Sequence, residues 1–282
     1  MEQQIDLFGN IIEDKKPLKE IYGENPFTVL NSADGRWQAR KNKWKNLGIK
    51  SEIGRNVQTF NTNMNGNPST NTSVFDPVLT ELIYRWFCPV GGAVLDPFAG
   101  GSVRGIVANY LGYKYTGIDI RQEQVDSNRE QALSILELNN QPQWYVGDSD
   151  KLLDDEWDKK FDLVFSCPPY ADLEVYSDLK GDISNMEYKD FLIAYRSIIR
   201  KSCRLIKEDG FACFVVGEIR DKNGNYYGFV PDTIRAFMDC GMRYYNEAIL
   251  QTPIGTAAYR ANGNMKSKKL VKTHQNILVF KK

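Results

Sequence analysis

The stretch VLDPFAGGSVRG, residues 94–105, decides the fold. A short apolar run leads into a glycine-rich turn, and the turn leads into residues with helical spacing. Glycines let the backbone approach a ligand closely, and the first N–H groups of a helix face whatever occupies the turn. The pattern predicts a buried strand over 93–96, a ligand-binding turn, and a helix over 102–112 that ends at Gly112.

Strands and helices alternate from this stretch to the C-terminus. We expect further strands over 115–119, 143–148, 161–166, 211–218, 242–251 and 275–280, and helices over 75–87, 121–136, 187–206 and 230–241. The last two strands follow each other with no expected helix between them. This order predicts an α/β fold with a mostly parallel, seven-stranded sheet and an antiparallel edge hairpin.

The first 73 residues lack this alternation. Residues 1–26 mix charged and apolar side chains without a sustained period, which indicates an N-terminal arm. Residues 27–73 form a basic extension whose second half is rich in Asn, Thr and Gly, as linkers are. We therefore expect the main domain to cover residues 74–282.

Composition excludes several classes of protein. The hydrophobic content of 42% is ordinary for a soluble domain, and no apolar run approaches the roughly 20 residues of a membrane span. The N-terminus does not read as a signal peptide. Five cysteines contain no CxxC pair, so we expect neither a metal site nor a disulfide framework. The simplest expectation is a cytoplasmic protein with no membrane partner.

Acidic residues follow three successive expected strands. Asp119 lies 23 residues after Asp96, the spacing at which a carboxylate meets the hydroxyls of a ribose. Asp148 follows the next strand. Because parallel strands end at the same edge of a sheet, these three acids predict one site for a nucleotide-like ligand.

Basic residues concentrate in two segments, although the net charge is zero. Residues 36–55 hold seven basic side chains against one acid, with two tryptophans among them, and residues 259–282 hold seven with no acid. Solvated surface is one interpretation; contact with phosphates and stacking on bases is the other. The candidate DNA contacts are Arg36, Trp37, Arg40, Lys41, Lys43, Trp44, Lys45, Lys266, Lys268 and Lys269.

The segment FSCPPYADLEVYSDL, residues 165–179, follows an apolar run with two prolines and an aromatic residue. Together, DPFAGG, GIDI, GDS and SCPPY resemble the S-adenosylmethionine-dependent DNA methyltransferases that act on N6 of adenine or N4 of cytosine. Residues 25–55 are similar to segments that precede the methylase in a phage and prophage subgroup of this family. The resemblance covers roughly residues 26–282. It implies a class I methyltransferase (Rossmann-like) fold, S-adenosylmethionine as cofactor, DNA as partner, no metal, and DNA methylation of the restriction-modification kind.

The resemblance also implies roles for individual residues. Residues 96–101 would wrap the methionine moiety of the cofactor, and residues 75–77 would close over its carboxylate. Residues 119–120 would meet the ribose and residues 148–149 the adenine ring. The cofactor-binding set is therefore Phe75, Asp76, Pro77, Asp96, Pro97, Phe98, Ala99, Gly100, Gly101, Asp119, Ile120, Asp148 and Ser149.

The catalytic set implied by the resemblance is Cys167, Pro168, Pro169 and Tyr170. In this family the first side chain and the first proline carbonyl accept the hydrogens of the target amine, and the aromatic ring stacks on the flipped base. Cys167 departs from the Asp, Asn or Ser that the family carries, and a neutral thiol is a weak acceptor. A neighbouring positive charge would make it a better one.

Three alternatives stay open. Cys167 could attack a pyrimidine ring for C5-cytosine methylation, although those enzymes place the cysteine after the prolines. The chain could be a methyltransferase for RNA guanine amines or protein glutamine, which share an Asn/Asp-Pro-Pro-Tyr loop. It could also be a catalytically degenerate DNA-binding protein. We favour amino methylation of DNA, with adenine N6 ahead of cytosine N4.

The arm carries one further motif. Gln4, Ile5, Asp6, Leu7 and Phe8 resemble the short peptide with which bacterial DNA-processing proteins dock on the replication sliding clamp. Leu7 and Phe8 suit an apolar pocket, and a terminal segment can present them. The alternative is that the same side chains pin the N-terminus to the protein's own core.

Overall fold

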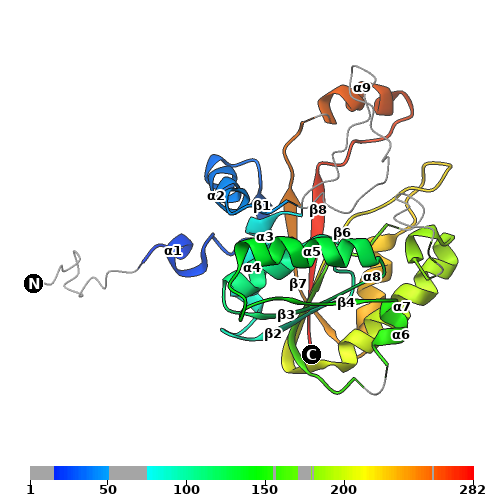
Figure 1. Ribbon diagram of the computed structural model, residues 1–282. Helices are drawn as coiled ribbons and strands as arrows, with labels where there is room; N and C mark the ends of the chain where they lie inside the picture. Colours follow the sequence, from blue (N-terminus) through cyan, green and yellow to red (C-terminus); the bar gives the residue numbers. More distant parts are fainter. Residues whose placement is uncertain (1–15, 51–74, 155–156, 171–178, 180, 256) are drawn as a thin grey trace, which may run out of the picture.

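An eight-stranded sheet with the order β1-β7-β8-β6-β5-β2-β3-β4 forms the centre of the protein (Figure 1). The computed structural model describes residues 16–50, 75–154, 157–170, 179, 181–255 and 257–282. Only β8 runs antiparallel to its neighbours, β6 and β7. The strands are β1 (Val29–Asn31), β2 (Ala93–Asp96), β3 (Lys114–Asp119), β4 (Gln143–Val146), β5 (Phe161–Ser166), β6 (Ile206–Val216), β7 (Arg243–Gln251) and β8 (His274–Lys281).

Helices cover both faces of this sheet because its strands are apolar on both sides. Val94 packs toward α3, α4 and α5, and the next residue, Leu95, packs toward α7 and α8. The helices are α1 (Leu18–Tyr22), α2 (Gly35–Asn46), α3 (Pro77–Phe87), α4 (Val103–Tyr110), α5 (Gln122–Ile135), α6 (Ser149–Leu152), α7 (Tyr188–Arg204), α8 (Phe229–Met238), α9 (Ala257–Lys266) and the 3₁₀ helix η2 (Ile183–Asn185).

The predicted α/β architecture and mostly parallel sheet are confirmed, with two corrections at the edge. The β7–β8 pair is antiparallel as expected, but α9 lies between these two strands, where no helix was expected. In addition, β1 lies outside the pair and runs parallel to β7. Ser32 continues this pairing, because its N–H and its hydroxyl both donate to the carbonyl of Gln251, at 3.0 and 2.8 Å. The sheet therefore has eight strands rather than seven, and residues 29–46 pack against the main domain.

The sheet topology positions the site. β2 lies between β3 and β5, so the connections that leave β2 and β5 diverge at this point, which is where open α/β sheets bind ligands. The turn after β2, the acids after β3 and β4, and Cys167 after β5 all lie at the carboxyl edge. The connection from β7 to β8, which contains α9, leaves from the same edge. In the part of the chain that the structure describes, no helix has the length and apolarity needed to span a membrane.

Candidate active site

A cavity of about 480 Å³ opens at this carboxyl edge. Its size is that of a small-molecule site. It brings together most of the residues that the sequence predicted for the cofactor and for catalysis. From those two sets, the lining residues are Phe75, Asp76, Pro97, Phe98, Gly100, Gly101, Asp119, Ile120, Asp148, Ser149, Cys167, Pro168, Pro169 and Tyr170.

Asp119 connects the end of β3 to the glycine turn. Its Oδ2 accepts a hydrogen bond from the N–H of Gly100 at 2.9 Å, and its Oδ1 accepts one from the N–H of Arg121 at 2.9 Å. Gly100 has φ +50°, in the left-handed region that favours glycine. The carboxylate is 12% exposed and lines the cavity, so its position is fixed at the ligand-facing surface.

Asp148 and Ser149 occupy the end of β4 in different ways. The Asp148 carboxylate caps α6 by accepting from the N–H of Asp150 at 2.9 Å, and it lines the cavity beside Gly181. The hydroxyl of Ser149 donates to the carbonyl of Pro97 at 2.6 Å. Ser149 therefore braces the turn after β2, while Asp148 faces the cavity.

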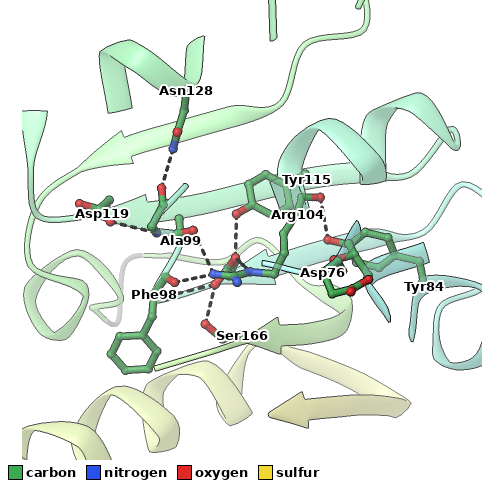
Figure 2. A network of polar contacts seen from close by, with 12 residues as sticks. Asp76, Tyr84, Phe98, Ala99, Arg104, Tyr115, Asp119, Asn128 and Ser166 are labelled. Atoms are coloured by element: carbon green, nitrogen blue, oxygen red, sulfur yellow. Dashed lines mark hydrogen bonds and ion pairs between the residues drawn. The ribbon is translucent and has the colours of Figure 1, made fainter. Parts of the chain in front are cut away.

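Asp96 does not line the cavity, which corrects the role expected for it. Its carboxylate is fully buried and accepts from Arg104 Nε at 2.5 Å, from the Tyr115 hydroxyl at 2.8 Å and from the Ser166 hydroxyl at 2.5 Å (Figure 2). Burial, and then the Asp96 carboxylate, raise the pKa of Tyr115, so this hydroxyl stays protonated and donates. Through these contacts, Asp96 stabilises the glycine turn from the interior of the protein. Ala99 and Pro77 are also buried and lie behind the lining.

Arg104 is a cavity residue that the sequence analysis missed. Its Nη2 donates to the carbonyls of Phe98 and Ala99 at 2.8 and 2.9 Å, and its guanidinium carbon lies 4.6 Å from the centre of the Phe75 ring. Burial alone would lower the pKa of Arg104, but the Asp96 carboxylate, together with Tyr115 and Cys167, raises it above its ordinary value. Arg104 therefore carries a fixed positive charge, close enough to Cys167 for the two groups to interact electrostatically.

Asp76 joins the basic N-terminal segment to the cavity. It caps α3 by accepting from the N–H of Val78 at 2.9 Å, and it also accepts from Lys41 Nζ at 2.9 Å and from Trp37 Nε1 at 3.2 Å. Lys41 itself lines the cavity. Lys41 was predicted as a DNA contact, but here it is part of the wall around Phe75.

The predicted stacking of Trp37 and Trp44 on bases is wrong. Their side chains are buried in the core, at 3% and 6% exposure, and Trp44 Nε1 donates to Glu81 at 3.0 Å. Arg40 is also engaged, in an ion pair with Glu81. The candidate DNA contacts that stay on the surface are Arg36, Lys43, Lys45, Lys266 and Lys268, with Lys269 half-buried. The clamp-like residues 4–8 lie outside the described part of the chain.

Tyr170 ends the described part of the SCPPY segment, with its ring held at two points. The ring packs edge-on against Phe229 at a centroid distance of 6.0 Å, and Gln275 Nε2 donates to its hydroxyl at 3.4 Å. Both Tyr170 and Gln275 line the cavity. Neither Phe229, in α8, nor Gln275, in β8, was predicted, because both lie far from Tyr170 in sequence.

Comparisons with known proteins bear on the family and on the fold. Residues 13–130 match a family model of N6/N4-type DNA methylases, described as DNA methylase. TrmN from Thermus thermophilus is similar in structure, with 14% identity and a TM-score of 0.50, over 76% of this chain and 51% of TrmN. The chain therefore spans about half the length of that protein.

A second solved structure is similar over nearly its whole length. It is a protein from Pyrococcus horikoshii proposed to be an RNA methyltransferase, with 18% identity and a TM-score of 0.50, over 86% of this chain and 98% of that one. No curated protein is similar in sequence to this chain at a significant level. At such identities the likeness shows the fold alone: it is the class I fold of S-adenosylmethionine-dependent methyltransferases, as predicted.

Proposed function

We propose that the protein transfers a methyl group from S-adenosylmethionine to an exocyclic amino group of a DNA base, with adenine N6 favoured over cytosine N4. One observation carries the proposal: a single cavity joins the glycine turn and Asp119 to Pro168 and Tyr170. A methyl donor held by the glycine turn and Asp119 would face an acceptor held by Pro168 and Tyr170. The DNA methylase match over residues 13–130 supports DNA as the substrate.

The charges of the cavity fit S-adenosylmethionine. Lys41 and Arg104 lie on the side of Phe75, where the charged amino-acid end of the cofactor would bind. Asp119 lies on the side of β3, where its oxygens suit the two ribose hydroxyls. Ile120 and Asp148 then flank the position of the adenine ring. When bound, the cofactor supplies a methyl group on a positively charged sulfur.

The residues after β5 hold the target amine. The carbonyl of Pro168 accepts a hydrogen bond from one N–H of the amine, and Cys167 accepts a hydrogen bond from the other. The ring of Tyr170 stacks on the base. Arg104 supplies the neighbouring positive charge that improves Cys167 as an acceptor. Catalysis then comes chiefly from orienting the amine, without a covalent intermediate.

The connection between β7 and β8 has the charge expected of a segment that contacts a DNA duplex. Residues 252–273 contain no acidic side chain, and α9 buries only Ala257 of its ten residues. Arg260 and Lys266 are exposed on α9, and Lys268 is exposed just after it. The connection that contains α9 leaves from the edge where the cavity opens (Figure 1). A basic element beside a base pocket can contact the phosphates around the flipped nucleotide.

The deciding experiment offers DNA, RNA and protein side by side with tritiated S-adenosylmethionine. We expect label in DNA, and mass spectrometry of its nucleosides should identify N6-methyladenine, with Tyr170→Ala as the inactive control. Label in RNA or protein would favour those substrates. Covalent trapping by a duplex with 5-fluorocytosine, lost in Cys167→Ser, would favour C5-cytosine methylation, the alternative that a cavity-lining thiol beside Arg104 allows.

The biological setting proposed here rests on sequence. We place the protein among phage and prophage methylases or restriction-modification enzymes, in the cytoplasm, with residues 4–8 docking on the sliding clamp. Tethering to the clamp would raise the enzyme's concentration at newly made DNA. A peptide of residues 1–13 should bind a purified clamp, whereas the same peptide with Leu7→Ala and Phe8→Ala should not. Equal binding of both peptides would exclude docking.

A further inference from the structure

Lys272 belongs to the basic C-terminal segment in sequence, but its charge is not on the surface. Its Nζ is buried, and among the residues that the structure describes it has no hydrogen-bond partner. Burial lowers the pKa of Lys272, and Glu218 only partly offsets this. A buried ammonium without an acceptor is costly, and such a group calls for an explanation in the function of the site.

Glu218 is the acidic residue that attracts Lys272, but its carboxylate is hydrogen-bonded to the start of α8. Its two carboxylate oxygens accept from the N–H groups of Phe229 and Val230, each at 3.1 Å, at the start of α8. This arrangement fixes Glu218 at the helix start and leaves the ammonium without an ion-pair partner within the described residues. The described residues therefore supply no acceptor for this ammonium, and a ligand is one source that could supply it.

The ammonium lies beside the ring that is proposed to stack on the target base. A Cβ atom placed on Gly217 would come 2.7 Å from Lys272 Nζ and 3.7 Å from the Tyr170 hydroxyl, so both groups border the same small space. Gln275, three residues after Lys272, donates to that hydroxyl and lines the cavity. Gly217 leaves room for the ammonium because it has no side chain.

We infer that Lys272 binds the nucleotide turned out of the duplex, donating to a hydrogen-bond acceptor on its base or on its phosphate. The inference rests on the proposed function, because it needs a nucleotide stacked on Tyr170. Because the Lys272 ammonium is already buried, its desolvation cost is met when the protein folds. An acceptor on the substrate can then bind the ammonium without first displacing water from it.

Replacing Lys272 gives a signature that a structural lysine would not give. Lys272→Met removes the buried charge and keeps the chain length, so the melting temperature should rise. Transfer of tritiated methyl groups to DNA should fall about 10- to 100-fold, the range for losing a hydrogen bond to a charged group. Calorimetric affinity for S-adenosylmethionine should not change, because Lys272 Nζ lies beside Gly217 and Tyr170 rather than at the glycine turn and Asp119.

Two further variants complete the comparison. Lys189→Met, at an exposed lysine of α7, should change neither the melting temperature nor the transfer rate. Gly217→Ala should displace the ammonium while keeping its charge, and DNA transfer should fall as in Lys272→Met. The inference is overturned if Lys272→Met transfers methyl groups at the wild-type rate, or if its melting temperature falls. A wild-type protein that is inactive on DNA would instead contradict the proposed function.

The source of the acceptor can be identified with small probes. Deoxyadenosine and its 5′-monophosphate can be titrated into the wild type and Lys272→Met in the presence of S-adenosylhomocysteine, with binding followed by NMR. Weaker binding of both probes to the variant places the acceptor on the base. Weaker binding of the monophosphate alone places it on the phosphate.

Discussion

Lys41 Nζ lies 2.9 Å from the carboxylate of Asp76, and this ion pair connects α2 to the N-cap residue of α3 at the wall of the cavity. Both side chains are mostly buried, at 21% and 10% exposure. On the same helix, Lys43 and Lys45 are exposed. The basic segment therefore has an inner face at the cofactor cavity and an outer face toward solvent.

Substitutions on these two faces should affect different ligands in binding experiments. Lys41→Met should weaken S-adenosylmethionine binding by about 1–3 kcal/mol, because it removes a charged partner from Asp76 and from the cavity. Lys43→Met with Lys45→Met should leave cofactor binding unchanged and flatten the salt dependence of DNA binding by about 0.9 log unit for each lost phosphate contact. Calorimetry and salt titrations measure the two effects. An unchanged slope would move the DNA contacts to the α9 region.

Asp119 provides the test of the cofactor site. Asp119→Ala should weaken S-adenosylmethionine binding by about 1–3 kcal/mol, through loss of charge-assisted hydrogen bonds to the ribose and of the bond that holds Gly100. Asp126→Ala, at an exposed acid of α5, is the control and should bind normally. If calorimetry detects no binding by the wild type, the cofactor assignment fails.

Tyr170 and Cys167 distinguish the two methylation mechanisms. Tyr170→Ala should cost roughly 1–3 kcal/mol of stacking and abolish most turnover. Tyr170→Phe keeps the ring and loses the hydroxyl that accepts a hydrogen bond from Gln275, so it should retain most activity. Cys167→Ser should stay active, because a hydroxyl oxygen is a better hydrogen-bond acceptor than a neutral thiol. An inactive Cys167→Ser protein would point to a thiol nucleophile.

The buried network under the glycine turn predicts a stability effect. Asp96→Leu leaves the Arg104 guanidinium buried without its carboxylate and should lower the free energy of unfolding by about 3–5 kcal/mol. The double variant Asp96→Leu with Arg104→Met removes both charges and should recover part of that loss. Urea unfolding measures both. If the single variant is as stable as the wild type, the ion pair does not hold the turn.

Cys240 predicts a pH dependence of chemical labelling. A hydrogen bond from Cys203 lowers the pKa of Cys240 to about 7, and the charge of Arg196 assists. Because the thiolate is the form that reacts, alkylation of Cys240 by iodoacetamide should accelerate as the pH rises through about 7. The buried Cys88 and Cys213, whose pKa values burial raises, should react far more slowly. Peptide mass spectrometry identifies the labelled residue, and preferential labelling of Cys213 would contradict the prediction.

The parallel strands and the turn after β2 were predictable because their apolar runs and glycines are local signals. β1 was not, since three residues with only Leu30 buried carry no detectable period. Arg104 was missed because a charged residue in a helix normally faces solvent, and only the fold brings it under Asp96. Its neighbours in the apolar run VRGIVA were the one available hint.

The tryptophans of the basic segment show how composition misled. Trp37 and Trp44 stand among basic residues, which suggested a nucleic-acid surface. Their separation of two helical turns places both rings on one face of α2, and that face packs against α3. Lys272 was not distinguished from the other lysines of residues 259–282, because nothing local in the sequence shows that its ammonium is buried.

The pairing of β1 with β7 also governs when the site can form during synthesis. Ser32 meets Gln251, a partner 219 residues away in sequence, and contacts of such separation form late because a long loop must first close. A chain emerging from the ribosome can form β2 to β5 early. The part of the cavity wall that contains Ser32 and Lys41 cannot pair with the sheet until β7 and β8 have emerged. The complete cavity is therefore acquired only after β7 has been translated, and a chain truncated before β7 lacks part of the cavity wall.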